Sequence, residues 1–158
     1  MNKDLLFRFD EGIFNVRAAG ILIKDKMILL QKESGGSEYA LPGGQIRMNE
    51  DAEDALKREF IEETGAGIRV ERLLFTEECF WSFGGTARHT VTLYFSVSET
   101  EDTLYAKENA CTPQKDNKNV VWGFVPLDAV PSLTVYPDFL SDALKIPSSG
   151  VRNYVSRY

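Results

Sequence analysis

The sequence contains little cysteine, no long apolar run and no export signal. Cys79 and Cys111 are the only cysteines among 158 residues, and two distant cysteines make no disulfide framework, so we expect reduced thiols. No apolar run approaches the ~20 residues that a membrane span needs. The N-terminus is mixed and acidic and lacks the apolar core of a signal peptide. We therefore expect a cytoplasmic protein without a membrane partner.

Positive charge is also scarce. The chain has 24 acidic residues against 18 Lys and Arg, which gives a net charge of −6. Domains that bind nucleic-acid polymers usually present a basic face, so a nucleic-acid polymer is not an expected partner. A small anionic ligand remains compatible with this charge, because a bound metal ion can reverse the local field.

Length and composition predict one mixed α/β domain. A chain of 158 residues with 43% hydrophobic residues can bury a core without disulfides, and we expect residues 1–158 to form a single domain. Periodicity and turn residues predict hairpins over 17–33 and 67–97, strands over 39–41 and 120–127, helices over 49–64 and 138–146, and a polar loop over 98–119. This order favours a sheet covered by helices.

The helix predicted over residues 49–64 has recognisable ends. Asn49 is expected to be its N-cap, with Glu50 and Asp51 in the first turn, where the helix dipole favours acids. Gly65 is expected to end the helix at the position after the C-cap. Pro137 is expected at the first position of the last helix, because proline is tolerated there.

Three glutamates crowd the end of the 49–64 helix: Glu59, Glu62 and Glu63. At ~100° per residue they continue the stripe that Ala52, Ala55 and Leu56 form earlier in the helix. A solvated acidic face is one interpretation, since charge runs are usually exposed. Unpartnered carboxylates on a buried stripe are costly, however, and hard divalent ions such as Mg²⁺ or Mn²⁺ prefer carboxylate oxygens.

The spacing around these glutamates matches a known motif. Five residues separate Gly44 from Glu50, and seven separate Glu50 from Arg58, which opens the run REFIEETGA. This pattern over Gly44–Ala66 resembles the signature of the Nudix hydrolases. Every invariant letter matches; Phe60 is aromatic where the family has an aliphatic residue, and Ala66 is small for its position. The looser resemblance extends from about residue 15 to residue 144.

The resemblance implies a Nudix-type α/β/α sandwich around a central mixed sheet. It also implies Mg²⁺-dependent hydrolysis (with Mn²⁺ as an alternative ion) of a nucleoside diphosphate linked to another moiety. Nucleoside triphosphates, ADP-ribose and other nucleotide sugars, dinucleoside polyphosphates and coenzyme A all remain open as substrates. The alternative is a non-catalytic Nudix-fold module that binds or senses a nucleotide, either as a monomer or as a homodimer.

The resemblance assigns roles to the motif residues. Glu59, Glu62 and Glu63 match the metal-binding glutamates, and Arg58 matches the arginine that orients them. Without a divalent cation, this end of the helix is then expected to be the least stable part of the fold.

Three further motif residues match structural positions of the family. Glu50 matches a structural or outer glutamate, Gly44 allows a close approach of the backbone, and Gly65 ends the motif helix.

Residues outside the motif are less determined. The general base is either a motif glutamate (Glu62 or Glu63) or an acid from another segment, with Glu78, Glu108 and Asp116 as candidates. Glu108 is favoured because long loops often carry function. Phe80 and Trp81 are candidates for stacking on a nucleobase, and Arg47 is a candidate phosphate contact. Packing and solvation are the alternatives for all three.

Overall fold

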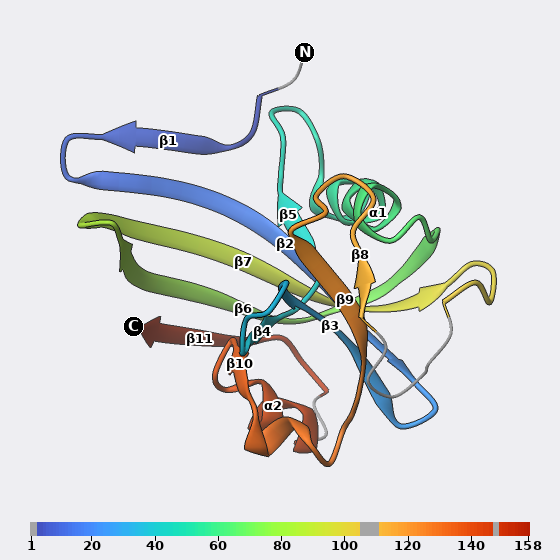
Figure 1. The fold of residues 1–158 in the computed structure, drawn as a ribbon. Helices are drawn as coiled ribbons and strands as arrows, with labels where there is room; N and C mark the ends of the chain where they lie inside the picture. Colours follow the sequence, from blue (N-terminus) through green and yellow to red (C-terminus); the bar gives the residue numbers. More distant parts are fainter. Residues whose placement is uncertain (1–2, 105–110, 147–148) are drawn as a thin grey trace.

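The computed structural model describes residues 3–104, 111–146 and 149–158 (Figure 1). The strands are β1 (Leu6–Phe9), β2 (Gly12–Lys24), β3 (Met27–Glu33), β4 (Glu38–Ala40), β5 (Gly43–Gln45), β6 (Ile68–Phe83), β7 (Thr86–Glu99), β8 (Thr112–Pro113), β9 (Val120–Pro126), β10 (Thr134–Tyr136) and β11 (Arg152–Arg157). The helices are α1 (Ala52–Glu63) and α2 (Leu140–Lys145), with a 3₁₀ turn at Val130–Ser132. Neither α-helix in the described ranges has the length and apolar content to cross a membrane.

The strands form one mixed sheet in the order β10-β4-β3-β2-β7-β6-β11. Strand β2 is its organising element, because it pairs in parallel with β7 along most of its length. Its other edge is divided among three antiparallel partners: β1, then β5, then β3 next to the turn. Strand β3 therefore leaves β2 soon after the turn and continues into a ladder with β9.

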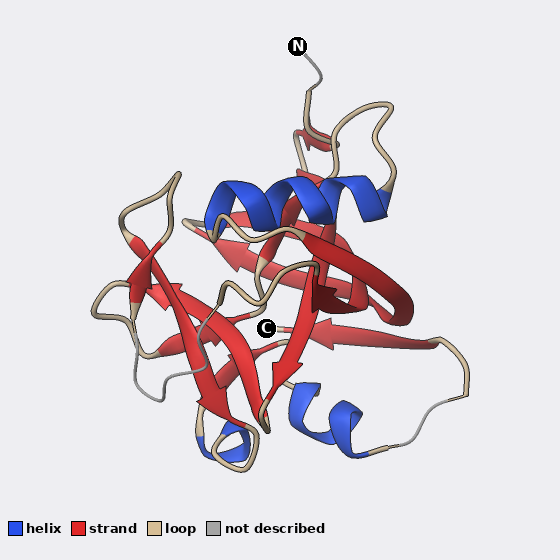
Figure 2. Cartoon of the chain, turned by 90° about the vertical axis from the view of Figure 1, so that its right-hand side faces the viewer, coloured by secondary structure: helices blue, strands red, loops and turns tan. Residues whose placement is uncertain are grey.

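The helices cover opposite faces of this sheet, as Figure 2 shows. Successive strand residues point to opposite faces. Ala18 and Leu22 of β2 belong to the buried cluster that contains Leu56 and Phe60 of α1. The intervening Ala19 and Ile21 belong to the cluster that contains Leu140 of α2. The expected α/β architecture with a mixed sheet between helices is therefore confirmed.

Both predicted hairpins are present. Strands β2 and β3 are joined by Asp25 and Lys26, which both adopt positive φ, 51° and 62°. This conformation suits the tight turns that match the twist of paired strands. Strands β6 and β7 are joined by Gly84 and Gly85 and pair along nearly their whole length.

The start of α1 differs from the prediction. Asn49 is not the N-cap; its φ is +63° and it lies in the turn before the helix. Asp51 caps α1 instead, since its Oδ1 accepts a hydrogen bond of 2.9 Å from the backbone amide of Asp54. Glu50 consequently lies outside the helix. Gly65 has the predicted role, because its φ is +82° and its amide donates to carbonyls of the last helical turn.

The C-terminal elements also differ from the prediction. The last helix begins at Leu140, three residues after Pro137, which follows a cis peptide bond. Outside this region, strands β1 and β5 were not predicted, and neither were β10 and β11; the short strand β8 lies inside the segment that was expected to be a loop. These five strands are short or lie at a sheet edge, where hydrophobic alternation is weak.

The packing of α1 yields a stability prediction. Leu56 is fully buried between α1 and the sheet, whereas Ile61 on the outer face of the same helix is 55% exposed. Leu56→Ala should lower the free energy of unfolding in urea by about 2–5 kcal/mol, because it leaves a cavity. Ile61→Ala is the matched control and should change it by less than about 0.5 kcal/mol. Equal effects of the two substitutions would contradict this placement of the helix.

Candidate active site

The C-terminal half of α1 lies between β5 on one side and the segment before β9 on the other. The backbone amide of Gly43 in β5 donates 3.2 Å to Oε2 of Glu63. The backbone amide of Lys115 donates 2.9 Å to the carbonyl oxygen of Glu63. These bonds hold the last turn of the helix in place and bring residues 114–117 beside it.

Arg58 joins the acidic residues of this region to one another. Its guanidinium donates to both carboxylate oxygens of Glu50, at 2.8 and 2.9 Å. It also donates to Glu59 at 2.6 Å, to Glu62 at 3.2 Å and to the carbonyl oxygen of Gln45 at 3.0 Å. Hydrogen bonding to Arg58 lowers the pKa of the Glu50 carboxyl. The structure thus places Arg58 where it orients two of the three predicted metal-binding glutamates.

Glu59 lies over the backbone of Gly44. A Cβ atom at Gly44 would overlap the Glu59 carboxylate, so only glycine leaves room for this carboxylate. Gly44 itself belongs to β5, and the backbone conformation that requires glycine is found at Gly43, with φ of +142°. Burial raises the pKa of Glu59, and the hydrogen bond from Arg58 partly offsets this effect.

Glu63 is the most buried of the three glutamates, with 6% of its surface exposed. Burial, followed by repulsion from Glu59, raises its pKa to about 8. Within the described part of the chain, the only hydrogen bond to its carboxylate comes from the Gly43 amide. Among the residues that the structure describes, an ionised Glu63 therefore has no cation at hydrogen-bond distance, although the charge of Arg17 acts on it from farther away. A bound cation would supply a direct partner.

The carboxylates suit a hard divalent cation in ligand type and in charge. Glu59 and Glu63 line one hollow together, whereas Glu62 lines neither of the two hollows described below and is half-exposed beside Arg58. In the arrangement of residues 3–104, 111–146 and 149–158, no three acidic, histidine or cysteine side chains converge on one point. The carboxylates of Glu59 and Glu62 are turned toward Arg58 instead. Their oxygen ligands and negative charge match a divalent ion, and holding one together with Glu63 would require Glu59 and Glu62 to turn away from Arg58.

Beside the glutamates lies a hollow of about 360 Å³, which we call the catalytic hollow. Arg17 lies in it and donates 3.1 Å from Nη2 to the carbonyl oxygen of Gly43. Asp116, one of the three candidate bases outside the motif, also lines it, close enough to raise the pKa of Glu63 further. The complete lining is Asp4, Arg17, Gln31, Gly43, Gly44, Gln45, Arg47, Glu59, Glu63, Gln114, Asp116, Asn117 and Val120.

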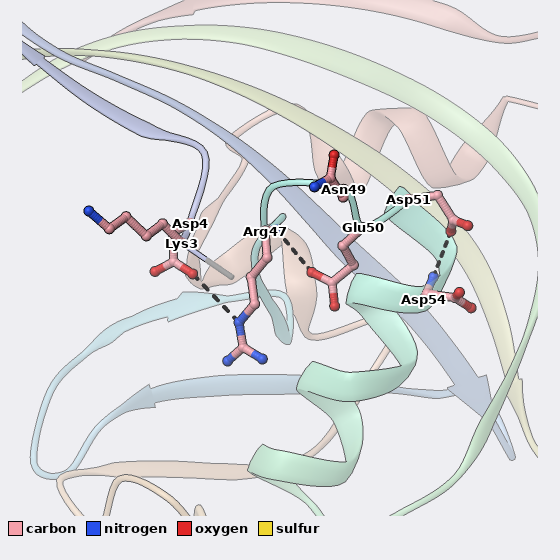
Figure 3. Close-up of a pocket in the computed structure, with 7 residues that line it drawn as sticks. All are labelled: Lys3, Asp4, Arg47, Asn49, Glu50, Asp51 and Asp54. Carbon is pink, nitrogen blue, oxygen red and sulfur yellow. Dashed lines mark hydrogen bonds and ion pairs between the residues drawn. The ribbon is translucent and has the colours of Figure 1, made fainter. Parts of the chain in front are cut away.

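A second, larger hollow of about 930 Å³ adjoins the first and shares Asp4 and Arg47 with it (Figure 3). Arg47 forms ion pairs with Asp4 at 3.7 Å and with Glu62 at 3.6 Å. Its backbone amide donates 2.9 Å to Glu50. The candidate phosphate contact Arg47 therefore lies next to a predicted metal-binding glutamate.

Other predicted residues lie elsewhere. Phe80 stacks on His89 with ring centroids 4.3 Å apart, and Trp81 donates from Nε1 to Thr90 at 3.3 Å. Glu78 lies 3.9 Å from His89. None of Phe80, Trp81 and Glu78 lines either hollow. Glu108, the favoured base, lies outside the described residues.

The neutral side chains of the catalytic hollow were missed. Gln31, Gln45, Gln114 and Asn117 line it from β3, from β5 and from the segment before β9. Single amides scattered over three segments carry no periodic or motif signal in a sequence. Only the pairing of the strands brings them together.

Comparison with known proteins shows the family and the fold of this chain. The NUDIX domain family matches residues 14–142. The MutT protein from Bacillus halodurans superposes with a TM-score of 0.66 at 18% identity, covering 91% of this chain and 90% of that one. A MutT NUDIX hydrolase from Burkholderia pseudomallei gives 0.58 at 20% identity, with coverage of 85% and 98%. An ADP-ribose pyrophosphatase from Streptococcus suis gives 0.51 at 15%, with 89% and 98%.

The burial of Glu63 predicts a pH dependence of stability in metal-free buffer. Its folded-state pKa of about 8 lies above the ordinary value of 4.5. Between these values the folded protein holds a proton that the unfolded chain releases, so this contribution to stability falls as pH rises, at up to ~1.4 kcal/mol per pH unit. Denaturation in EDTA from pH 4 to 9 should show this loss relative to Glu63→Gln, which cannot ionise.

The exposed Glu53 on the same helix provides the control. Glu53→Gln should follow the wild-type pH profile. If Glu63→Gln also follows it, Glu63 is not the buried, uncompensated carboxyl described above.

Proposed function

The chain belongs to the NUDIX domain family and is a hydrolase of phosphoric anhydrides, and we propose that it splits the pyrophosphate bond of a nucleoside diphosphate linked to another moiety, with Mg²⁺ as cofactor. One observation carries this proposal. Glu59 and Glu63 line a hollow at the end of α1, and Glu63 is buried there with no cation at hydrogen-bond distance among the described residues. Divalent cations with phosphate oxygens as further ligands satisfy such a site.

Glu59, Glu62 and Glu63 would hold the metal ion. When bound, the ion polarises phosphoryl oxygens and lowers the pKa of a coordinated water, with Mn²⁺ able to replace Mg²⁺. Arg58 donates a hydrogen bond to both Glu59 and Glu62, so its positive charge offsets the repulsion between their carboxylates while no metal ion is bound. Glu50 fixes Arg58 in turn through its two-point contact.

Two arginines are placed to receive the substrate. Arg17 and Arg47 line the catalytic hollow on either side of β5 and Glu59. A guanidinium matches phosphate oxygens with two parallel donors. We propose that Arg17 orients the pyrophosphate for attack, while Arg47 neutralises its outer oxygens beside Glu62.

Asp116 is the general base that the geometry favours. Asp116 lines the catalytic hollow with Glu59 and Glu63, whereas Glu78 lies outside this lining, 3.9 Å from His89. The docking of Lys115 on the end of α1 keeps Asp116 next to these acids. A carboxylate there can take the proton of the attacking water. The choice of Glu108 as base stays a prediction from sequence.

The motif glutamates provide the first test. Glu62→Gln and Glu63→Gln should each lower Mg²⁺-dependent turnover by at least about 100-fold, because each removes a charged ligand. The assay is a panel of nucleotides incubated with Mg²⁺ and scored by released monophosphate. The Glu53→Gln variant should keep wild-type turnover. Failure of the folded wild-type protein on every nucleotide would refute the catalytic function and favour a binding module.

A second set of variants identifies the base. Asp116→Asn should lower kcat by about 10²–10⁴-fold and remove the acidic limb of the pH–rate profile, since a general base acts only when ionised. Glu78→Gln and Glu108→Gln are the comparison variants. A comparable loss in Glu108→Gln with normal turnover in Asp116→Asn would assign the base to the 98–119 segment.

A further inference from the structure

Four neutral amides line the catalytic hollow together with the acidic and basic residues. We call this set, Gln31, Gln45, Gln114 and Asn117, the amide wall. Each carboxamide offers two N–H donors and an acceptor oxygen and carries no charge. Such groups recognise hydroxyls, carbonyls and ring nitrogens, whereas phosphates are usually met by arginine or lysine.

Part of the amide wall is held in a defined position. Gln114, only 4% exposed, donates 2.7 Å from Nε2 to Oε1 of Gln31. Gln31 in turn donates 3.4 Å to the carbonyl oxygen of Leu41, and the backbone amide of Gln114 is bonded to Val120. The two side chains are therefore organised before a ligand binds, and each retains free donor or acceptor capacity.

Gln45 adds an acceptor that lacks a partner. It lies directly opposite Arg17 in the β2–β5 ladder, so both side chains project to the same face of the sheet. Its Oε1 is buried and has no hydrogen bond within the described residues. A buried acceptor without a partner is costly, and a hydroxyl donor from a ligand would satisfy it.

The charges around the two hollows disfavour a substrate with a free terminal phosphate. The catalytic hollow has four acidic and two basic lining residues, and so does the larger hollow beside it. Arg47, shared by both, is already paired with Asp4 and Glu62. Arg17 is thus the one basic residue of the catalytic hollow that has no ion pair with a described residue. Since the proposed function assigns Arg17 and Arg47 to the two phosphates of the reacting bond, a further terminal phosphate would face amides and carboxylates, with Lys3 as the one basic residue left in the two linings.

We propose that the substrate is a diphosphate esterified at both ends, with a nucleoside on one side and an uncharged, hydroxyl-bearing group such as a sugar against the amide wall. This proposal rests on the proposed hydrolase function and narrows its substrate class. The oxygen of water forms a new bond to one phosphorus and the bridging P–O bond breaks. The bridging oxygen leaves with the other phosphate, so two phosphate monoesters form, and the two hydrogens of the water are released as protons when both monoesters are fully ionised.

The first test compares substrates of one nucleoside with the wild-type enzyme. UDP-glucose and UTP, and likewise ADP-ribose and ATP, are assayed with saturating Mg²⁺. We expect kcat/KM to be at least 10-fold higher for the sugar diphosphate in one of the two pairs. Higher values for both triphosphates would overturn this inference and leave the hydrolase function intact. No turnover of any of the four, or of the wider nucleotide panel, would instead count against the hydrolase function itself.

The second test assigns the sugar to the amide wall. UDP-glucose and the methyl ester of UDP have the same charge and the same scissile bond, but only one carries sugar hydroxyls. Gln114→Leu should lower kcat/KM for the sugar substrate at least 5-fold more than for the methyl ester. A structural defect would lower both equally, and that result would overturn the role of the wall.

Two further variants keep this test decisive. Asn117→Ala changes the exposed end of the amide wall and should also lower kcat/KM for the sugar substrate more than for the methyl ester. It serves as the test variant if Gln114→Leu fails to fold. Asn119→Ala, exposed on the same segment outside the lining of the hollow, should leave the ratio of the two substrates unchanged. Equal ratios in Asn117→Ala and Asn119→Ala would contradict the assignment. For ADP-ribose as the better sugar substrate, the methyl ester of ADP replaces that of UDP.

Discussion

The guanidinium of Arg58 is the contact on which the site depends. It joins the loop before α1 through Glu50, the strand β5 through the carbonyl of Gln45, and the acids of the helix through Glu59 and Glu62. Carboxylates this close on one helix repel each other. A planar cation with five donors can hold several of them at once, which an ammonium group cannot do with comparable direction. Arg58 thus makes it possible to gather negative charge at a buried helix end before any metal binds.

The glutamates around Arg58 differ in burial and in hydrogen bonding, and their pKa values are shifted accordingly. Glu50 receives hydrogen bonds from Arg58 and from a backbone amide, and its pKa is lowered. Burial raises the pKa of both Glu59 and Glu63, but Glu59 accepts a hydrogen bond from Arg58 that partly offsets the effect. Glu59 and Glu63, which look equivalent in the sequence, therefore differ in how strongly each needs a cation. The rotation of the helix and the depth of each position determine this difference.

Much of the architecture could be predicted from the sequence because its signals are local. The hairpin turns, the buried stripe of α1 and the stop at Gly65 depend on residues close in the chain, and the motif spacing identifies Glu59, Glu62 and Glu63 without any tertiary information. The N-cap was misplaced because Asn49 and Asp51 are both good capping residues, and the backbone conformation at Asn49 decides between them. Strand β11 was missed because its partner β6 is more than 70 residues away.

Asp116 was a candidate base from the sequence, but its meeting with Arg17 and Gln31 in one hollow could not be predicted, because no local pattern connects the three residues. They meet since one edge of β2 changes partner from β1 to β5 to β3, and the β3–β9 ladder then departs from the rest of the sheet. Because the sheet branches in this way, the proposed metal-binding residues and the residues that shape the hollow come from different elements. In the proposed function, the metal-binding groups come from the helix end, while the shape of the hollow depends on strands and turns that contribute isolated side chains. Selection can therefore exchange the recognising residues one at a time, and a change of substrate need not disturb the chemistry.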